Sequence, residues 1–219
     1  MNRPRLLVWS IPALLYLAFV AWYTDFGGPL RDEEIAAYVE QFEALGFSGK
    51  QRERILRFME SDTGRQFFML NAIDYAENPP DVPGAEPGES AAQLMSRYME
   101  HMYAELLKRA CHPTIAGNAI HTAMDLVGVD ALAGAERWDM GALLRYRSRR
   151  TFMEIVTIPE TRGRHEFKVA ALDKTIAYPI ETVINLGDPR LLLAFILLGA
   201  SALLDLALAR NQRPATRPE

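Results

Sequence analysis

Two long apolar segments, one near each end of the chain, limit the possible folds more than any other feature. Residues 6–23 contain no charged side chain, and residues 191–209 contain a single one, Asp205. An α-helix needs roughly 20 apolar residues to cross the hydrocarbon core of a bilayer. We therefore predict two transmembrane helices, within residues 1–25 and 185–210, with a folded region between them.

The first segment also has the length of a signal peptide, but no small-x-small cleavage pattern follows Trp22. An uncleaved anchor is the favoured interpretation. In the second segment, Asp205 lies within about one helical turn of Arg210. We expect this carboxylate to reach the membrane interface or to pair with that arginine, because an isolated charge in a bilayer is costly.

Arginines flank both apolar segments on the sides that face the chain ends. The positive-inside rule keeps such flanks in the cytoplasm. We expect both termini, including a tail at 211–219, to be cytoplasmic and the central region to lie outside, which in a bacterium means the periplasmic side of the inner membrane. The net charge of −4 argues against nucleic acid as a partner. The flanking arginines are Arg3, Arg5, Arg210, Arg213 and Arg217.

Residues 26–63 predict a helical hairpin. Apolar side chains recur at helical spacing in both halves, Gly46 stands where the first helix should end, and Ser48 stands at the start of the second. Two placements are open for this hairpin: packed on the central domain, or near the membrane surface.

Residues 64–184 carry the signals of an α+β domain. The stretch QFFMLNAIDY, at 66–75, is apolar on both faces and predicts a central strand. A loop rich in Pro, Gly and acids occupies 77–89. Ser90 then opens a capping box and a helix, whose methionine-rich stripe is typical of core packing. A second strand is expected at 114–124.

Residues 138–183 complete this domain. Apolar alternation predicts a strand over 140–146, and Ser148 is placed as the N-cap of a short helix that a longer one follows. Alternation returns at 176–180, where Pro179 restricts the last strand to an edge of the sheet because proline has no N–H. The order strand, helix, strand, strand, helix, strand is the ferredoxin-like βαββαβ arrangement, in which the first and third strands are central.

Three stretches of this domain resemble the dimeric α/β-barrel superfamily, which has a ferredoxin-like fold: FFMLNAIDY, LLRYRSRRTFMEIVTIPE and HEFKVAALDKTIAYPIE. The resemblance covers residues 64–184 and is closest to the uncharacterised DUF1330-like, YciI-like and EthD-like branches. It implies a homodimer whose two sheets close a barrel, and a small-molecule site between sheet and helices or in the barrel interior. Members of the superfamily include cofactor-free monooxygenases and haem proteins, so the fold does not determine the function.

The predicted ligand-binding residues are Arg145, Arg147 and Asn71. Arg145 and Arg147 lie on one face of the third strand, where guanidinium groups suit a carboxylate or phosphate ligand. The alternative is a solvated pair at the end of the strand, and Arg149 and Arg150 are interpreted as helix surface. The Asn71 amide either orients a ligand or is a hydrogen-bonded buried amide.

The candidate catalytic residues are His165 and His121, because imidazole titrates near neutral pH, and Tyr146 on the other face of the third strand. The four histidines include no pair at helical metal-ligand spacing, there is no HExxH motif, and Cys111 is the single cysteine. The neighbours of His165 give no support to haem ligation. We therefore predict neither a metal nor a cofactor.

Two functions follow from these patterns. The first is a membrane-anchored module that binds a small molecule or a partner protein outside the cytoplasm. The alternative is a cofactor-free monooxygenase-like or isomerase-like enzyme that acts on a small or lipidic substrate at the membrane. A buried cluster that joins Arg145 or Arg147 to a histidine beside an apolar cavity would favour the enzyme.

Overall fold

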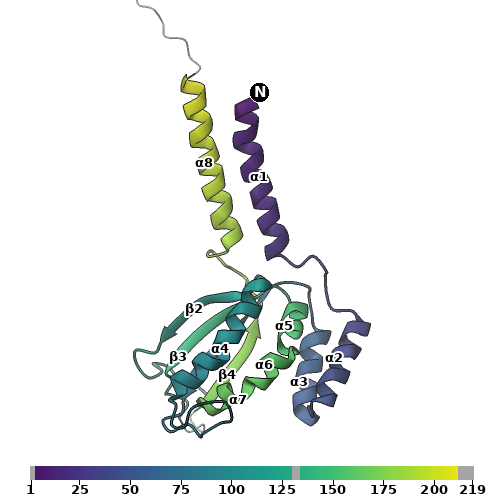
Figure 1. Cartoon of the computed structure of the whole chain (residues 1–219), viewed down its shortest axis with the longest axis vertical. Coiled ribbons are helices and arrows are strands. Elements are labelled where there is room, and N and C mark those ends of the chain that lie inside the picture. Colours follow the sequence, from purple (N-terminus) through teal and green to yellow (C-terminus); the bar gives the residue numbers. More distant parts are fainter. Residues whose placement is uncertain (1–2, 130–133, 212–219) are drawn as a thin grey trace, which may run out of the picture. The chain divides into compact units, whose positions relative to one another are not determined.

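A computed structural model describes residues 3–129 and 134–211 and divides the chain into two compact units (Figure 1). One unit consists of the terminal segments, up to Thr24 and from Val183 onward, and the other is Asp25–Thr182. The predicted tail lies outside the described residues from position 212 onward.

Helix α1 (Arg3–Tyr23) and helix α8 (Pro189–Asn211) form the terminal unit. Both are long and apolar enough to cross a membrane. The sequence prediction is confirmed to that extent: each apolar segment is one helix of sufficient length.

The two terminal helices run antiparallel and are linked near both ends. Arg5 donates through Nη2 to Asp205 Oδ2 at 2.6 Å, and Arg190 donates through Nη1 to Thr24 Oγ1 at 3.0 Å. Asp205 therefore pairs with Arg5 of the other helix and not with Arg210, because spacing within one helix carries no information about the neighbouring helix.

The other unit is an α+β domain with a four-stranded antiparallel sheet, as predicted. The strand order β2-β3-β1-β4 confirms that the first and third strands are central. Pro179 lies in the edge strand β4, as predicted, where a residue without an N–H is tolerated. The strands are β1 (Phe67–Tyr75), β2 (His112–Asn118), β3 (Met140–Tyr146) and β4 (Leu172–Ile180).

The helices between the strands lie over one face of this sheet (Figure 1). Helix α4 (Ala91–Lys108) begins after Ser90, which forms the predicted capping box with Gln93. Ser148 caps the helix after β3, as predicted, by accepting from the Thr151 N–H. Between β3 and β4 lie α5 (Arg149–Val156), α6 (Pro159–Gly163) and α7 (His165–Ala170).

Three predicted elements have different bounds in the structure. Strand β4 begins at Leu172, four residues before the alternation at 176–180. The longer helix expected before the last strand is divided into α6 and α7, since Pro159 begins a new helix and the chain turns again at Arg164. Strand β2 ends at Asn118 and does not continue to 124, because its partner β3 begins at Met140, the residue that Asn118 faces.

A core of six buried side chains closes one end of the space between the helices and the sheet. The Phe67 and Tyr146 rings, on neighbouring positions of β1 and β3, stack with centroids 5.2 Å apart. Burying such rings removes a large apolar area from water. We call this cluster the packed end of the domain; its members are Phe67, Met102, Leu106, Cys111, Tyr146 and Ile155.

The predicted hairpin consists of α2 (Asp32–Ala44) and α3 (Gly49–Glu60), and it packs on the central domain. Arg150 donates through Nε to Glu34 Oε1 at 2.8 Å, and Arg149 donates through Nη1 to the backbone carbonyl of Phe58 in α3. The side chains of Arg149 and Arg150 are 11% and 16% exposed, so their interpretation as helix surface is wrong. They are the polar links between α5 and the hairpin.

Candidate functional site

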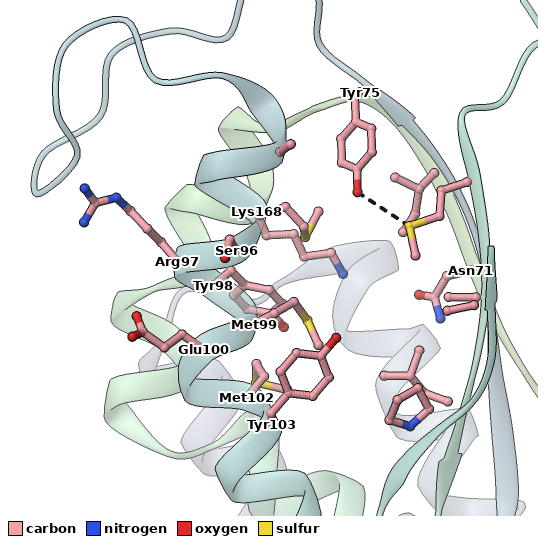
Figure 2. Close-up of a pocket in the computed structure, with 18 of the residues that line it drawn as sticks. Asn71, Tyr75, Ser96, Arg97, Tyr98, Met99, Glu100, Met102, Tyr103 and Lys168 are labelled. Carbon is pink, nitrogen blue, oxygen red and sulfur yellow. Dashed lines mark hydrogen bonds between the residues drawn. The ribbon is translucent and has the colours of Figure 1, made fainter. Parts of the chain in front are cut away.

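A cleft of about 820 Å³ lies between α4 and the sheet (Figure 2). Small-molecule sites typically have roughly 300–1,000 Å³. Alternate residues of β1 and β3 form one wall and one side of α4 forms the other, since the strand and helix periods each turn a set of side chains to the same space. Strands β1 and β3 contribute Asn71, Ile73, Tyr75, Met140, Ala142, Leu144 and Tyr146, and β2 contributes Pro113 and Ala116.

The cleft exists because small side chains on the sheet face part of α4. Ala116 and Ala142 are neighbours across β2 and β3, and both line the cleft. Met95 and Met99 line it from α4 without filling it. Met102, further along the same helix, is 4% exposed and lies in the packed end. The methionine-rich stripe of this helix predicted such core packing.

Lys168 of α7 supplies a charged group to the cleft. Figure 2 shows its side chain running into the space between α4 and the sheet. Its ammonium lies 5.7 Å from the centroid of the Tyr98 ring, and no acid within residues 3–129 and 134–211 pairs with it. Burial lowers the pKa of the Lys168 ammonium from its ordinary 10.5.

The acids that line the cleft are engaged with arginines. Arg97 donates through Nε to Glu89 Oε2 at 2.7 Å, and a Glu100 oxygen lies 3.7 Å from Arg164 Nη1. The hydrogen bonds from Arg97 lower the pKa of Glu89. Figure 2 shows Glu100 turned away from the cleft, and Glu89 is held by Arg97, which is also turned away, so neither acid neutralises Lys168.

Neutral polar groups complete the lining. Asn71 points into the cleft from β1, and its Nδ2 donates to a carbonyl of the same strand at 3.0 Å. The Tyr75 hydroxyl donates to Met140 Sδ at 3.5 Å. Tyr103 extends from α4 and is 48% exposed. Burial raises the pKa of Tyr146 above its ordinary value, so this hydroxyl stays protonated at neutral pH and cannot act as a base there.

Arg145 and Arg147 lie outside the cleft lining. Arg145 is on the other face of β3 and is 1% exposed. It donates through Nε to Gln66 Oε1 at 2.9 Å and through Nη1 to the Ala110 carbonyl at 2.6 Å. Arg147 donates through Nε to Thr151 Oγ1 at 3.4 Å. The structure thus gives Arg145 one partner just before β1 and another just after α4.

The two candidate histidines also lie outside the cleft lining. His121 is exposed in the segment after β2. His165 begins α7, and its ring packs edge-on against Tyr98 with centroids 6.3 Å apart. Burial and the charge of Lys168 both lower the pKa of His165. Across the described parts of the chain, no group of three or more His, Cys, Asp or Glu side chains is placed to hold a metal ion.

Of the predicted site residues, the structure brings Asn71 and Tyr146 to one cleft and leaves Arg145, Arg147, His121 and His165 outside it. Sequence reasoning missed Lys168. The signal was present, since Lys168 is the one charge in the apolar run FKVAAL, residues 167–172. An isolated lysine in such a run is either a solvated helix face or a cation directed inward, and its tertiary neighbours decide which.

No protein-family model and no curated protein matches this chain. Among solved structures, it is similar to the RPA0582 protein of unknown function from Rhodopseudomonas palustris, with 18% identity and a TM-score of 0.50 over 64% of this chain and 97% of that chain. The structure of methylated RPA0582 gives 18% identity and a TM-score of 0.51, with 65% and 96% covered. At this identity the likeness concerns the fold alone.

Proposed function

We propose that this chain is a membrane-anchored module that binds a small molecule in the cleft between α4 and the sheet. The cleft is the observation that carries the proposal. It combines suitable volume, mainly apolar walls and a few polar groups, which is the usual composition of a small-molecule site. A partner protein would need a broad surface, whereas Lys168 is directed into a concave space.

We assign the domain to the ferredoxin-like fold and, with it, to the dimeric α/β-barrel superfamily. The strand order β2-β3-β1-β4 supports this assignment, as does the placement of helical connections after β1 and after β3. The resemblance of residues 64–184 points the same way.

A homodimer is the second part of the proposal. The alternation that turns Asn71 into the cleft turns Leu70 and its neighbours to the opposite face of the sheet. On that face Ile115, Ile176 and Tyr178 are 67%, 50% and 47% exposed. A second copy of the chain would cover these apolar side chains and the edges of the sheet.

The third part is the orientation in a bacterial inner membrane. Helices α1 and α8 run antiparallel, so both chain ends lie at one end of the terminal unit. With arginines on the outer flanks, the positive-inside rule favours cytoplasmic termini and a periplasmic domain. Reporters fused to either terminus should give a cytoplasmic signal, and a periplasmic signal at either end would contradict this orientation.

The alternative remains a cofactor-free monooxygenase-like or isomerase-like enzyme acting on a small or lipidic substrate. One observation favours it: burial lowers the pKa of Lys168, which increases the unprotonated fraction of the amine, the form that a general base requires. Catalytic turnover that is lost when Lys168 is substituted would support the enzyme over the binding module.

Native mass spectrometry of the full chain, released from its own membrane, tests the binding function. We expect the wild-type chain to retain a small molecule. Ala142→Phe should abolish the mass increment because it fills the cleft, whereas Ala104→Phe, on an exposed position of α4, should keep it. An increment that survives Ala142→Phe, or a wild-type chain without one, would contradict the proposal.

A further inference from the structure

We propose that the cleft takes an apolar monocarboxylic acid whose carboxylate pairs with the ammonium of Lys168. This inference rests on the proposed binding function of the cleft and names the class of its ligand. It begins from the charge of Lys168, which the described residues leave without an acidic partner.

A partly buried cation without a counter-ion is unfavourable, and a ligand carboxylate would offset that cost through a charge-assisted hydrogen bond. The acids nearest to the cleft do not compete for this role. Glu89 is bound by Arg97, and Glu100 lies beside Arg164 and points away. The carboxylate that neutralises Lys168 must therefore come from another molecule.

The same geometry favours a ligand with a single negative charge. Arg97 belongs to the lining but is turned outward and engaged with Glu89. A phosphate dianion bound at Lys168 would keep one charge uncompensated in a mainly apolar space. Neutral groups can serve the second carboxylate oxygen, since Figure 2 places Asn71 and the Tyr103 hydroxyl around the same space.

The apolar walls of the cleft favour a carboxylic acid whose remaining part is apolar. Met95, Met99 and Met140 line the cleft, and unbranched thioether side chains adapt to flexible chains and rings. A volume of about 820 Å³ is far larger than a small acid such as acetate requires. The ligand class is thus an alkyl or aryl chain that ends in one carboxylate.

Equilibrium dialysis of the full chain in lipid nanodiscs tests this inference, with empty nanodiscs as the background. The probes are octanoate, 1-octanol and octylamine, which share a chain and differ in charge. We expect Lys168→Met to weaken octanoate binding by about tenfold or more and to leave 1-octanol binding unchanged. Lys50→Met, on the exposed surface of α3, should change neither. Retained 1-octanol binding also shows that the variant is folded.

Other outcomes overturn the inference in distinguishable ways. One such outcome is that 1-octanol binds and that octanoate binds to Lys168→Met as tightly as to wild type. Another is that octylamine binds the wild-type chain as tightly as octanoate. In either case the cleft binds ligands, but not through this ion pair. If octanal is trapped on Lys168 by borohydride while octanoate fails to bind, the amine serves a carbonyl ligand. If no probe binds the wild-type chain, the proposed binding function fails together with this inference.

Discussion

The packed end and the cleft lie under the same helix, yet one is filled and the other is open. At the packed end, Leu106 is 0% exposed and meets the large rings of Phe67 and Tyr146. At the cleft, side chains of α4 that are also apolar meet Ala142. The size of the side chains on the sheet, and not the hydrophobicity of the helix, decides where a cavity forms.

The packed end and the cleft also differ in the interaction partners of their cations. Arg145, beside the packed end, is 1% exposed and donates to Gln66 and to the Ala110 carbonyl. Lys168, in the cleft, lies beside the ring of Tyr98 and pairs with no acid among the described residues. The buried Arg145 with its internal partners is part of the scaffold, whereas the partly buried Lys168, which has no acidic partner there, is available to a ligand.

The largest expected effect compares truncation at the two ends. Leu106→Ala should lower the free energy of unfolding by roughly 3 kcal/mol, because it leaves a cavity in a filled core. Met95→Ala should cost less than about 1 kcal/mol, since Met95 borders space that is already open. Pulse proteolysis of the full chain in urea measures both. Equal losses would show that the cleft is as tightly packed as the core.

A smaller contrast is expected between the two cations. Arg145→Met should cost about 2 kcal/mol, because the Ala110 carbonyl and the Gln66 amide each lose a buried donor. Lys168→Met keeps the length of the side chain and removes an unneutralised charge, so it should leave stability unchanged or raise it by up to about 1 kcal/mol. The same urea titration applies. A large loss in Lys168→Met would mean that Lys168 has a structural role.

The smallest effect is the pH dependence that Lys168 imparts. Its pKa is lower in the folded chain than the ordinary 10.5 of the unfolded chain. Between these two values the unfolded chain binds more protons, so stability rises with pH across that window. We expect the unfolding free energy of wild type, relative to that of Lys168→Met, to increase as pH rises towards 10.5. A flat difference would show that the ammonium is well solvated.

Other titratable groups around this amine act differently. Burial raises the pKa of Tyr75 and of Tyr98, so their contribution lowers stability as pH rises, but only above their ordinary value of 10.0. His165 on α7 has a lowered pKa and completes its titration near or below neutral pH. Since His165 is unprotonated above neutral pH and the two tyrosines titrate only above this window, the difference between wild type and Lys168→Met reports on the amine of Lys168.

The sequence predicted those parts of the fold that depend on near neighbours. A stretch that is apolar on both faces predicted β1, and alternation predicted β3. The capping box predicted the start of α4, and Pro179 predicted that β4 lies at an edge. Each signal acts within a few residues of itself. Boundaries that depend on a partner were less accurate, as at the end of β2, which stops at Asn118 where β3 begins.

The candidate site could be predicted only in part, for a related reason. Asn71 and Tyr146 line the cleft because strand alternation determines the face on which they lie. Whether Arg145 faces a ligand depends on Gln66 and Ala110, which are distant in the sequence. Lys168 becomes notable only once α7 is placed beside α4 and no acid is found near the amine.

The most direct test is a titration of Lys168 itself. NMR of the full chain in nanodiscs with ¹³Cε-labelled lysine would follow this amine, with its signal assigned by loss in Lys168→Arg and with Lys50 as an internal reference. We predict that Lys168 titrates below 10.5 in the free chain and that octanoate raises its pKa while the Lys50 signal stays unchanged. A Lys168 titration that octanoate does not move would contradict the pairing of this ammonium with a ligand carboxylate.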